Sequence, residues 1–446
     1  MSFEWLTYQL DELCDFTNGF AFKSTDYVTK GIDTLEVFRM GYISRGGGYK
    51  EDATPVFVPK KYGKDLTKYL LKAGDVVIAM TDMKDKVAIL GNTAQIRHEN
   101  RFVLNQRVGC IRVKRSDLLC PNFLYFYSNS AHHITNLRSR ANSGVQVNLS
   151  TAAIKESALR IPPIAEQRVI SGLLMALDDR INLLSENNST LEAIAQALFK
   201  SWFIDFDPVR SKQEGRQPEG MDEATAALFT DSFQHSELGE IPKGWNIGNL
   251  GDIFTLRNER TKPSNQTFLL PYVPTESIDF KTMFLNTFKS GNEANSSLIL
   301  FKEGDILFGA MRPYFHKVCI APFNGVTRTT VFTLTPKDYL STAFALLQAF
   351  QEQTVSYATK HSEGSTIPYA KWKNSLEKMT IVIPNQGLQR KFSEIVMPLI
   401  KSGNENCSRS RTLANLRDTL LPRLISGQLR LPDAEEQIEV ELAKSL

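Results

Sequence analysis

The residues able to support catalysis in this 446-residue sequence are few and poorly arranged. The best nuclease-like set is Asp75 with Asp82 and Lys84, since acids and a lysine can hold a metal ion and an attacking water. A second segment of similar sequence has Arg312 and Tyr314 where Asp82 and Lys84 stand, which argues against this set. Phosphate-binding loops and the zinc-protease and hydrolase motifs do not occur in the sequence. We therefore expect no catalytic residue in this chain.

The histidines and cysteines are not spaced as metal ligands either. No pair among the six histidines has ligand spacing beside a carboxylate, so we expect them on the surface or in loops. The five cysteines are scattered and never form a C-x-x-C pair, which argues against both a disulfide framework and a zinc site. We expect reduced cysteines, no metal site and no cofactor held by this chain.

What remains is recognition chemistry for nucleic acid. Guanidinium and ammonium groups bind phosphates and guanine edges, and amides bind adenine edges. Loop-like segments rich in these groups occur in both halves of the chain, and the interval from Leu118 to Lys155 carries several bases without any acid. The residues that we predict to contact DNA are Lys23, Arg39, Lys84, Arg107, Arg138, Arg140, Asn142, Gln146, Asn148, Arg257, Arg260, Lys262, Arg312, Tyr314, Lys317, Arg328, Lys360 and Ser365.

The composition is that of an ordinary globular protein, with 42% hydrophobic and 23% charged residues. No apolar run approaches the roughly 18 residues of a membrane-spanning helix, and the N-terminus lacks the form of a signal peptide. We therefore expect a cytoplasmic protein. The net charge of +3 is too small to indicate a polyanionic partner by itself.

Internal similarity shows that the chain contains two copies of one unit. The longest match has no gap, so the globular part varies in length between copies while the segment after it does not. The matching segments are Trp5 to Leu13 with Trp245 to Ile253, Leu71 to Val77 with Phe301 to Leu307, and Ile161 to Phe203 with Ile383 to Ile425.

The gapless segment is predicted to be a long helix. From Ile170 to Trp202, apolar residues recur at alternating spacings of four and three, which is a heptad seam, and Pro162-Pro163 sets its start. In the second copy we expect Pro398 to bend the helix or delay its first turns. If the two helices pair antiparallel, Asn188 and Ser410 would help to fix their register. The alternative is that each helix packs only on its own domain.

The predicted fold is α+β, with two tandem globular domains joined by two long antiparallel coiled-coil helices. Short strand-like runs such as Val76–Ala79 and Val108–Val113 alternate with amphipathic helices. The segment between the copies is acidic and is expected to be a solvated linker with a short helix near Ala224 to Phe229. The predicted divisions are domain 1 over 1–163, a central helix over 164–205, the linker over 206–240, domain 2 over 241–385, a distal helix over 386–428 and a tail over 429–446.

Together these motifs resemble the specificity subunit of type I restriction-modification systems. The residues that carry the resemblance are the opening of each copy at Trp5 and Trp245, Gly74-Asp75 and Gly304-Asp305, Ile161 to Arg168, Leu198 to Phe203, Leu238 to Trp245, and Leu424 to Gly427. The resemblance implies two target recognition domains, each reading one half of a split, asymmetric target in double-stranded DNA, with the helices as a spacer. One departure is visible at the second helix, where Asn385 to Leu388 replaces Pro163 to Glu166.

The resemblance also implies the partners. Two methyltransferase subunits would carry S-adenosylmethionine and methylate adenine at N6, and two motor-nuclease subunits would use ATP and magnesium for translocation and cleavage. Two alternatives remain open at this point. One is a scaffold whose globular ends bind proteins, which salt-sensitive DNA binding would distinguish. The other is a solitary methylation system that uses the same kind of subunit.

Overall fold

In the computed structural model of the chain, residues 5–50, 53–83, 87–143, 146–364 and 366–429 are described. They form two compact units, one of Met1–Asp179 with Leu413–Leu446 and one of Arg180–Thr412. Among these described residues, no helix has the length and apolar character needed to cross a membrane.

The first unit is built around a four-stranded antiparallel sheet in the order β2-β9-β5-β7. The central strand β5 is buried at every position, which explains its continuous run of aliphatic residues. The unit also contains a three-stranded sheet, β4-β3-β8, and a terminal pair, β1-β12. The bounds are β1 Leu6–Gln9, β2 Cys14–Asn18, β3 Thr34–Phe38, β4 Phe57–Pro59, β5 Val76–Ala79, β7 Thr93–Gln95, β8 Phe102–Leu104, β9 Val108–Val113 and β12 Ala158–Ile161.

The second unit repeats this plan, which confirms the internal repeat. Its four-stranded sheet runs β16-β24-β21-β22, and β15 pairs with β25 as β1 pairs with β12. The second sheet is larger here and has the order β17-β20-β23-β18-β19. The bounds are β15 Asn246–Asn249, β16 Phe254–Arg257, β17 Arg260–Thr261, β18 Pro271–Val273, β19 Lys289–Ser290, β20 Leu298–Phe301, β21 Ile306–Gly309, β22 Val318–Ile320, β23 Gly325–Arg328, β24 Val331–Pro336 and β25 Thr380–Ile383.

Three short helices of each unit occupy equivalent places, and a fourth in each unit does not. A one-turn helix follows the first strand of each, and a pair of helices follows the last strand of each four-stranded sheet. A further short helix lies before the terminal strand of the first unit, and another precedes β18 in the second. The bounds are α1 Leu10–Leu13 and α8 Leu250–Ile253, α2 Pro121–Ser128 and α3 Ala131–Ser139, α10 Thr342–Phe350 and α11 Glu352–Lys360, α4 Thr151–Lys155 and α9 Asn265–Phe268.

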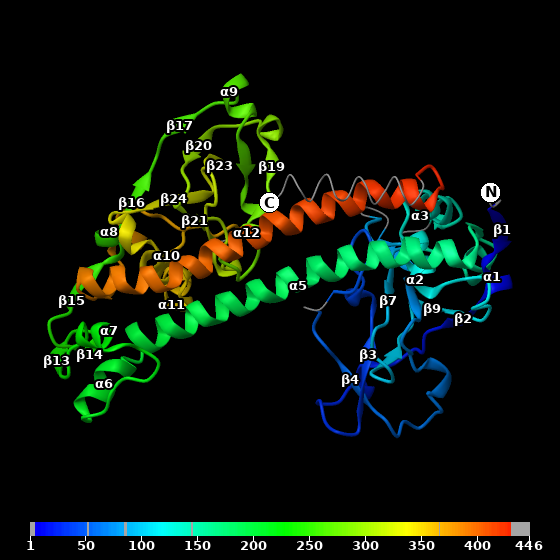
Figure 1. The fold of residues 1–446 in the computed structure, drawn as a ribbon, viewed down its shortest axis with the longest axis horizontal. Coiled ribbons are helices and arrows are strands. Elements are labelled where there is room, and N and C mark those ends of the chain that lie inside the picture. Colours follow the sequence, from blue (N-terminus) through cyan, green and yellow to red (C-terminus); the bar gives the residue numbers. More distant parts are fainter. Residues whose placement is uncertain (1–4, 51–52, 84–86, 144–145, 365, 430–446) are drawn as a thin grey trace. The chain divides into compact units, whose positions relative to one another are not determined.

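Two long helices, α5 (Ile164–Phe203) and α12 (Gln386–Ile425), each contain 40 residues (Figure 1). Within the second unit, the ring centroids of Phe199 and Phe392 lie 5.9 Å apart, and the Asn188 side chain donates to the carbonyl of Gly403 at 3.0 Å. Residue numbers therefore rise along one helix while they fall along the other, so the predicted antiparallel pairing is confirmed.

Asn188 fixes the register as predicted, and its polar partner on α12 is Asn406, whose side-chain amide donates to it at 2.9 Å. One detail of the helix prediction is wrong. Pro398 does not delay the second helix, which begins at Gln386. Phe392 and Val396 are fully buried and hold the first turns in place, while Pro398 lies on the exposed side.

The segment 206–240 is folded and is not a solvated linker. It forms α6 (Asp207–Gln213), α7 (Glu223–Ala227), β13 (Phe233–Ser236) and the start of β14 (Gly239–Pro242). Its apolar residues Phe206, Val209 and Phe229 are buried in the same hydrophobic cluster as Trp202 and Trp245. The acidic composition misled the prediction because the acids point outward while these few apolar side chains carry the packing.

Candidate nucleic-acid interface

Loops from distant parts of the sequence meet at one edge of the first unit. The backbone N–H of Met80 donates to the carbonyl of Arg107 at 2.9 Å, and that of Leu149 donates to Met80 at 2.8 Å. A small sheet then joins β6 (Thr81–Met83) to β11 (Gln146–Asn148) and β10 (Asn142–Ser143). These loops are therefore positioned by strand ends of the rigid sheet, as recognition loops commonly are.

Five of the predicted DNA-contacting residues, Arg39, Arg107, Asn142, Gln146 and Asn148, belong to this edge. The loop of Arg39 joins it through Asn105, whose backbone N–H donates to the carbonyl of Phe38 at 3.1 Å.

Two features of this edge are unusual for a purely structural loop. The Arg39 side chain donates to the carbonyl of Thr54 at 2.6 Å, yet its Nε atom and Asn105 Oδ1 are buried without a hydrogen-bond partner among the described residues. Buried polar atoms are nearly always paired, so two such atoms at one edge are unusual. Arg107 is exposed and has a φ of 71°, a strained conformation for an arginine that tends to occur at functional sites.

The second unit builds an equivalent edge from different residues. The backbone N–H of Ala310 donates to Thr330 at 2.9 Å, and that of Arg312 donates to Pro368 at 2.7 Å. The Tyr369 hydroxyl donates to the carbonyl of Thr329, and the hydroxyls of Thr275 and Thr330 lie 2.8 Å apart. The frame matches that of the first unit, while the side chains that it presents differ.

Arg312, Tyr314 and Lys317 lie at this second edge. Arg312 has a φ of 52°, and its Nε atom is buried without a partner among the described residues, as is that of Arg39. Tyr314 is 46% exposed and carries a hydroxyl able to contact a base or phosphate. Lys317 donates to the carbonyl of Thr275 at 2.8 Å, and burial lowers the pKa of its amine.

The cationic residues of the larger sheet lie along its strands. Arg328 ends β23 and stands opposite Leu298 of β20, which in turn stands opposite Thr261 of β17. Arg260 and Lys262 therefore lie two strands away from Arg328, and all three residues are exposed.

The remaining predicted residues lie outside this sheet. Lys360 is an exposed residue of the last turn of α11, and Lys23 precedes a short helical turn in the first unit. Lys84 and Ser365 lie outside the described residues.

The interpretation of Arg257 as a DNA contact requires correction. Its Nε atom lies 2.8 Å from a carboxylate oxygen of Asp305, which is 2% exposed, so the two form a largely buried ion pair. In the first unit the corresponding acid, Asp75, pairs with Arg112 of β9 at 2.7 Å, so the acid is shared while the arginine comes from a different strand. Gly-Asp in each copy therefore supplies the acid of a structural ion pair.

Two further predicted arginines already donate to the protein itself. Arg138 donates from Nε to the carbonyl of Leu90 at 2.9 Å and is half-buried, while Arg140 donates to the carbonyl of Glu156 at 3.2 Å and is exposed. Each has further N–H groups, since a guanidinium carries five donors.

The acids of the nuclease-like set have other partners. Asp75 is in the ion pair above, and Asp82 accepts backbone N–H groups of Ala88 and Ile89, each at 2.7 Å. Burial tends to raise the pKa of Asp82, but these backbone hydrogen bonds outweigh it and the pKa is lowered. Across the described ranges, no group of three or more His, Cys, Asp or Glu side chains is arranged to hold a metal ion.

Two histidines are buried. His133 lies within α3, contrary to the expectation of a surface or loop position, whereas His316 lies in a loop as expected. His133 is 3% exposed and packs edge-on against Tyr127, and burial lowers its pKa to about 4. His316 is 4% exposed and lies 2.8 Å from the carbonyl of Phe350 through Nε2. Both are packing residues, a role that polar sequence context does not reveal.

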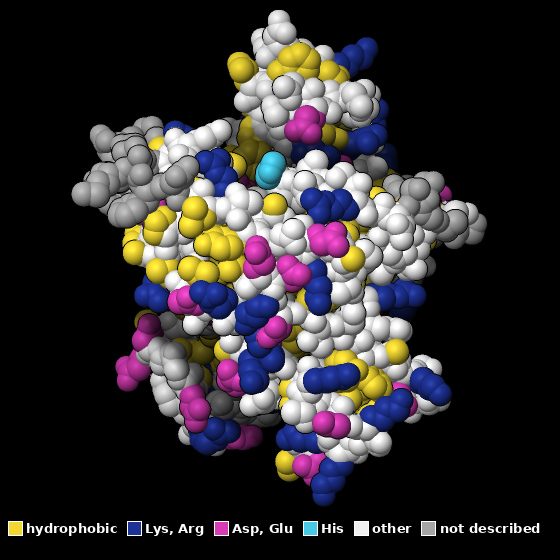
Figure 2. Space-filling model, turned by 90° about the vertical axis from the view of Figure 1, so that its right-hand side faces the viewer, with side chains coloured by type: hydrophobic (Ala, Val, Ile, Leu, Met, Phe, Trp, Pro, Cys, Tyr) yellow, Lys and Arg dark blue, Asp and Glu magenta, His cyan; other side chains and the backbone are white. Residues whose placement is uncertain are grey.

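The charges seen in Figure 2 are mixed. Lys and Arg side chains alternate with Asp and Glu over much of this face, as expected for a chain with 52 bases and 49 acids. Affinity for a polyanion must therefore come from local groups of cations, not from the overall charge.

The sequence matches the family described as type I restriction modification DNA specificity domain over residues 3–193 and 242–410. The chain belongs to this family of specificity subunits. It is 28% identical to the MjaIX specificity subunit of Methanocaldococcus jannaschii over 354 residues, covering 75% of this chain and 74% of that protein. It is 25% identical to the HindI specificity subunit of Haemophilus influenzae over 366 residues, covering 70% and 78% of the two chains.

A solved structure with the same fold is the S subunit of a type I restriction-modification system from M. genitalium. It superimposes with a TM-score of 0.56 at 16% identity and covers 95% of this chain and 96% of its own. This likeness confirms the predicted fold class, and the match to the family over residues 3–193 and 242–410 confirms the predicted family.

Proposed function

We propose that this chain reads a bipartite, asymmetric target in double-stranded DNA and directs partner subunits to it. The observation that carries the proposal is the duplicated frame with different side chains at its two loop edges. One edge presents Arg39, Arg107 and the amides of β10 and β11, whereas the other presents Arg312 and Tyr314. Different donors on one frame favour different base edges, so each unit would read its own half-site.

The partners follow from the family. Two methyltransferase subunits would bind S-adenosylmethionine and methylate adenine at N6, and two motor-nuclease subunits would supply ATP-driven translocation and magnesium-dependent cleavage. This chain would contribute only the recognition of the DNA target. The engagement of Asp75 and Asp82 by an arginine and by backbone N–H groups supports that division of labour.

The test is a domain exchange. Residues 1–160 are replaced by the corresponding domain of another specificity subunit, and methylated adenines are mapped in the DNA of cells that carry the complete system. We expect one half of the methylated motif to change while the other half stays the same. A change in both halves, or in neither, would contradict one half-site per unit.

A further inference from the structure

A lysine-rich stretch of the first unit has no assigned role. Residues 60–72, here called the lysine segment, contain Lys60, Lys61, Lys64, Lys68 and Lys72 and a single acid, Asp65. The corresponding residues 290–302 of the second copy contain one lysine and one acid. The positive charge is therefore a property of this copy and not a requirement of the shared fold.

The charges of the lysine segment are not neutralised by acids. Lys60 donates to the backbone carbonyl of Ile32 at 3.1 Å, while the amines of Lys64 and Lys68 lie over the rings of Phe20 and Tyr69. Within the described part of the chain, no lysine of the segment forms an ion pair with an acid.

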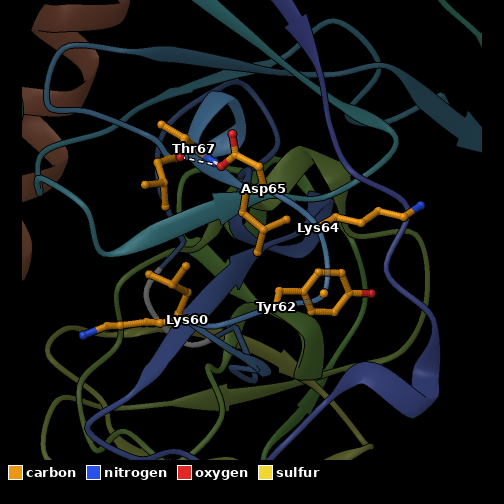
Figure 3. Close-up of a pocket in the computed structure, with 9 residues that line it drawn as sticks. Lys60, Tyr62, Lys64, Asp65 and Thr67 are labelled. Carbon is orange, nitrogen blue, oxygen red and sulfur yellow. Dashed lines mark hydrogen bonds between the residues drawn. The ribbon is translucent and has the colours of Figure 1, made fainter.

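The single acid of the segment is occupied by its own backbone. The Asp65 carboxylate accepts the Thr67 backbone N–H at 2.9 Å and the Thr67 hydroxyl at 2.5 Å (Figure 3). These bonds shape the turn that carries the lysines and leave Asp65 with less capacity to pair with them.

An aromatic platform supports the segment. The ring of Phe20 lies 5.6 Å from Tyr62 and 5.3 Å from Tyr69, and the Tyr62 hydroxyl donates to Asp26 at 2.7 Å. In Figure 3, Lys60 extends to one side of an open hollow of about 340 Å³, and Lys64 and the Tyr62 ring extend to the other side. Because the backbone is held by this packing, binding an anion here orders mainly the lysine side chains.

The platform also connects the lysine segment to the candidate interface of the first unit. Phe20 donates its backbone N–H to Leu104 at 2.9 Å and accepts that of Gln106 at 2.8 Å. Gln106 is adjacent to Arg107, so Phe20, whose ring lies under the Lys64 amine, is bonded directly to the loop of Arg107. If a DNA duplex binds at that loop, its phosphates extend on either side of the contacted bases, with one negative charge per roughly 1.7 Å of helix axis.

We propose that the lysine segment binds the phosphate backbone of duplex DNA next to the half-site read by the first unit. The inference rests on the proposed function and adds an asymmetry to it, since the second unit has no equivalent set of cations at this position. Lysine amines act as point charges for phosphate and carry no sequence information. The segment therefore contributes affinity and salt dependence, and the methylated sequence does not depend on it.

The experiment measures how the affinity of the full-length chain for a duplex of unrelated sequence depends on salt. The variant is Lys60→Gln with Lys64→Gln and Lys68→Gln. The slope of log affinity against log salt should fall in magnitude by roughly 2 to 3 between about 50 and 200 mM, because each lost phosphate contact contributes about 0.9.

A matched control removes three exposed lysines of the second unit, through Lys302→Gln, Lys337→Gln and Lys378→Gln. The total loss of charge is equal, but these residues lie at strand ends away from the second loop edge, so we expect a slope change below about 1. An unchanged slope in the lysine-segment variant, with binding by the parent chain intact, would overturn the inference alone. Failure of the parent chain to bind duplex DNA would instead overturn the proposed function. A change of methylated sequence in the lysine-segment variant would contradict the backbone role.

Discussion

At the scale of single residues, arginines of similar sequence context play opposite parts. Arg257 and Arg260 are three positions apart, but Arg257 pairs with the buried Asp305 whereas Arg260 is exposed and donates to Asn258. Asp305 also accepts the Thr335 hydroxyl at 2.6 Å and the Lys302 backbone N–H at 2.8 Å. Removal of the Arg257 side chain would therefore leave the buried Asp305 carboxylate with hydrogen-bond donors but without its positively charged partner.

We expect Arg257→Ala to lower the free energy of unfolding of the second unit by about 3 to 5 kcal/mol, because it leaves a buried carboxylate without its partner. Urea unfolding followed by tryptophan fluorescence would measure this. Three of the four tryptophans, Trp202, Trp245 and Trp372, lie in this unit.

Arg260→Ala is the control, and we expect it to change the same free energy by less than about 0.5 kcal/mol. Equal effects of the two substitutions would mean that the buried ion pair is not what distinguishes these arginines.

At the scale of elements, a loop around Phe284 connects the strands of the second unit to its pair of long helices. The Glu192 carboxylate of α5 accepts the Met283 backbone N–H and the Thr282 hydroxyl, and burial raises the pKa of this carboxyl. On the facing helix, Gly403 lies directly against the Phe284 ring, where a Cβ atom would overlap it. The loop thus depends on a glycine in the middle of a long helix.

This contact predicts an inverted response to glycine replacement. Alanine in a helix interior normally stabilises by about 1 kcal/mol relative to glycine. We expect Gly403→Ala to destabilise the second unit by about 1 to 3 kcal/mol, since the added methyl group must displace a fully packed ring. Thermal or urea unfolding measures the change.

Gly172→Ala is the matched control, because a Cβ atom added to Gly172 of α5 would meet no atom of the described residues within 4 Å. It should stabilise the first unit by about 0.5 to 1 kcal/mol. If Gly403→Ala also stabilised the protein, the Phe284 loop would have moved aside at little cost in free energy. That outcome would contradict the predicted role of Gly403.

At the scale of the whole molecule, the proposed function makes the paired helices a spacer between half-sites. One heptad adds roughly 10 Å to a helix without turning its apolar seam, and about three base pairs of B-DNA span the same length. Because Asn188 of α5 pairs with Gly403 and Asn406 of α12, a heptad added to one helix alone would break this register.

We therefore expect a variant with one heptad inserted after Leu184 and another after Arg409 to lengthen the unread gap by about three base pairs. Both half-sites should stay unchanged, because the recognition loops are untouched. Mapping methylated adenines measures the gap. The original gap, or altered bases in either half, would refute the spacer role.

The elements that depend on local periodicity could be predicted from the sequence. The heptad seam after Pro163 specified a helix, and α5 begins at Ile164. The aliphatic runs at Val76–Ala79 and Val108–Val113 are the strands β5 and β9 with the same bounds. Periodicity and proline act through the nearest turns of the chain, so they can be read without the rest of the fold.

Which residues meet across the fold could not be predicted from the sequence. Thr81–Met83 pairs with Gln146–Asn148 across more than sixty positions, and nothing in either segment predicts its partner. The role of Arg257 likewise depends on an acid that lies 48 positions away, and Phe206 is buried although its neighbours are acidic. Such contacts arise when strands assemble into sheets and apolar side chains find a common core, which are properties of the whole domain and not of a local segment.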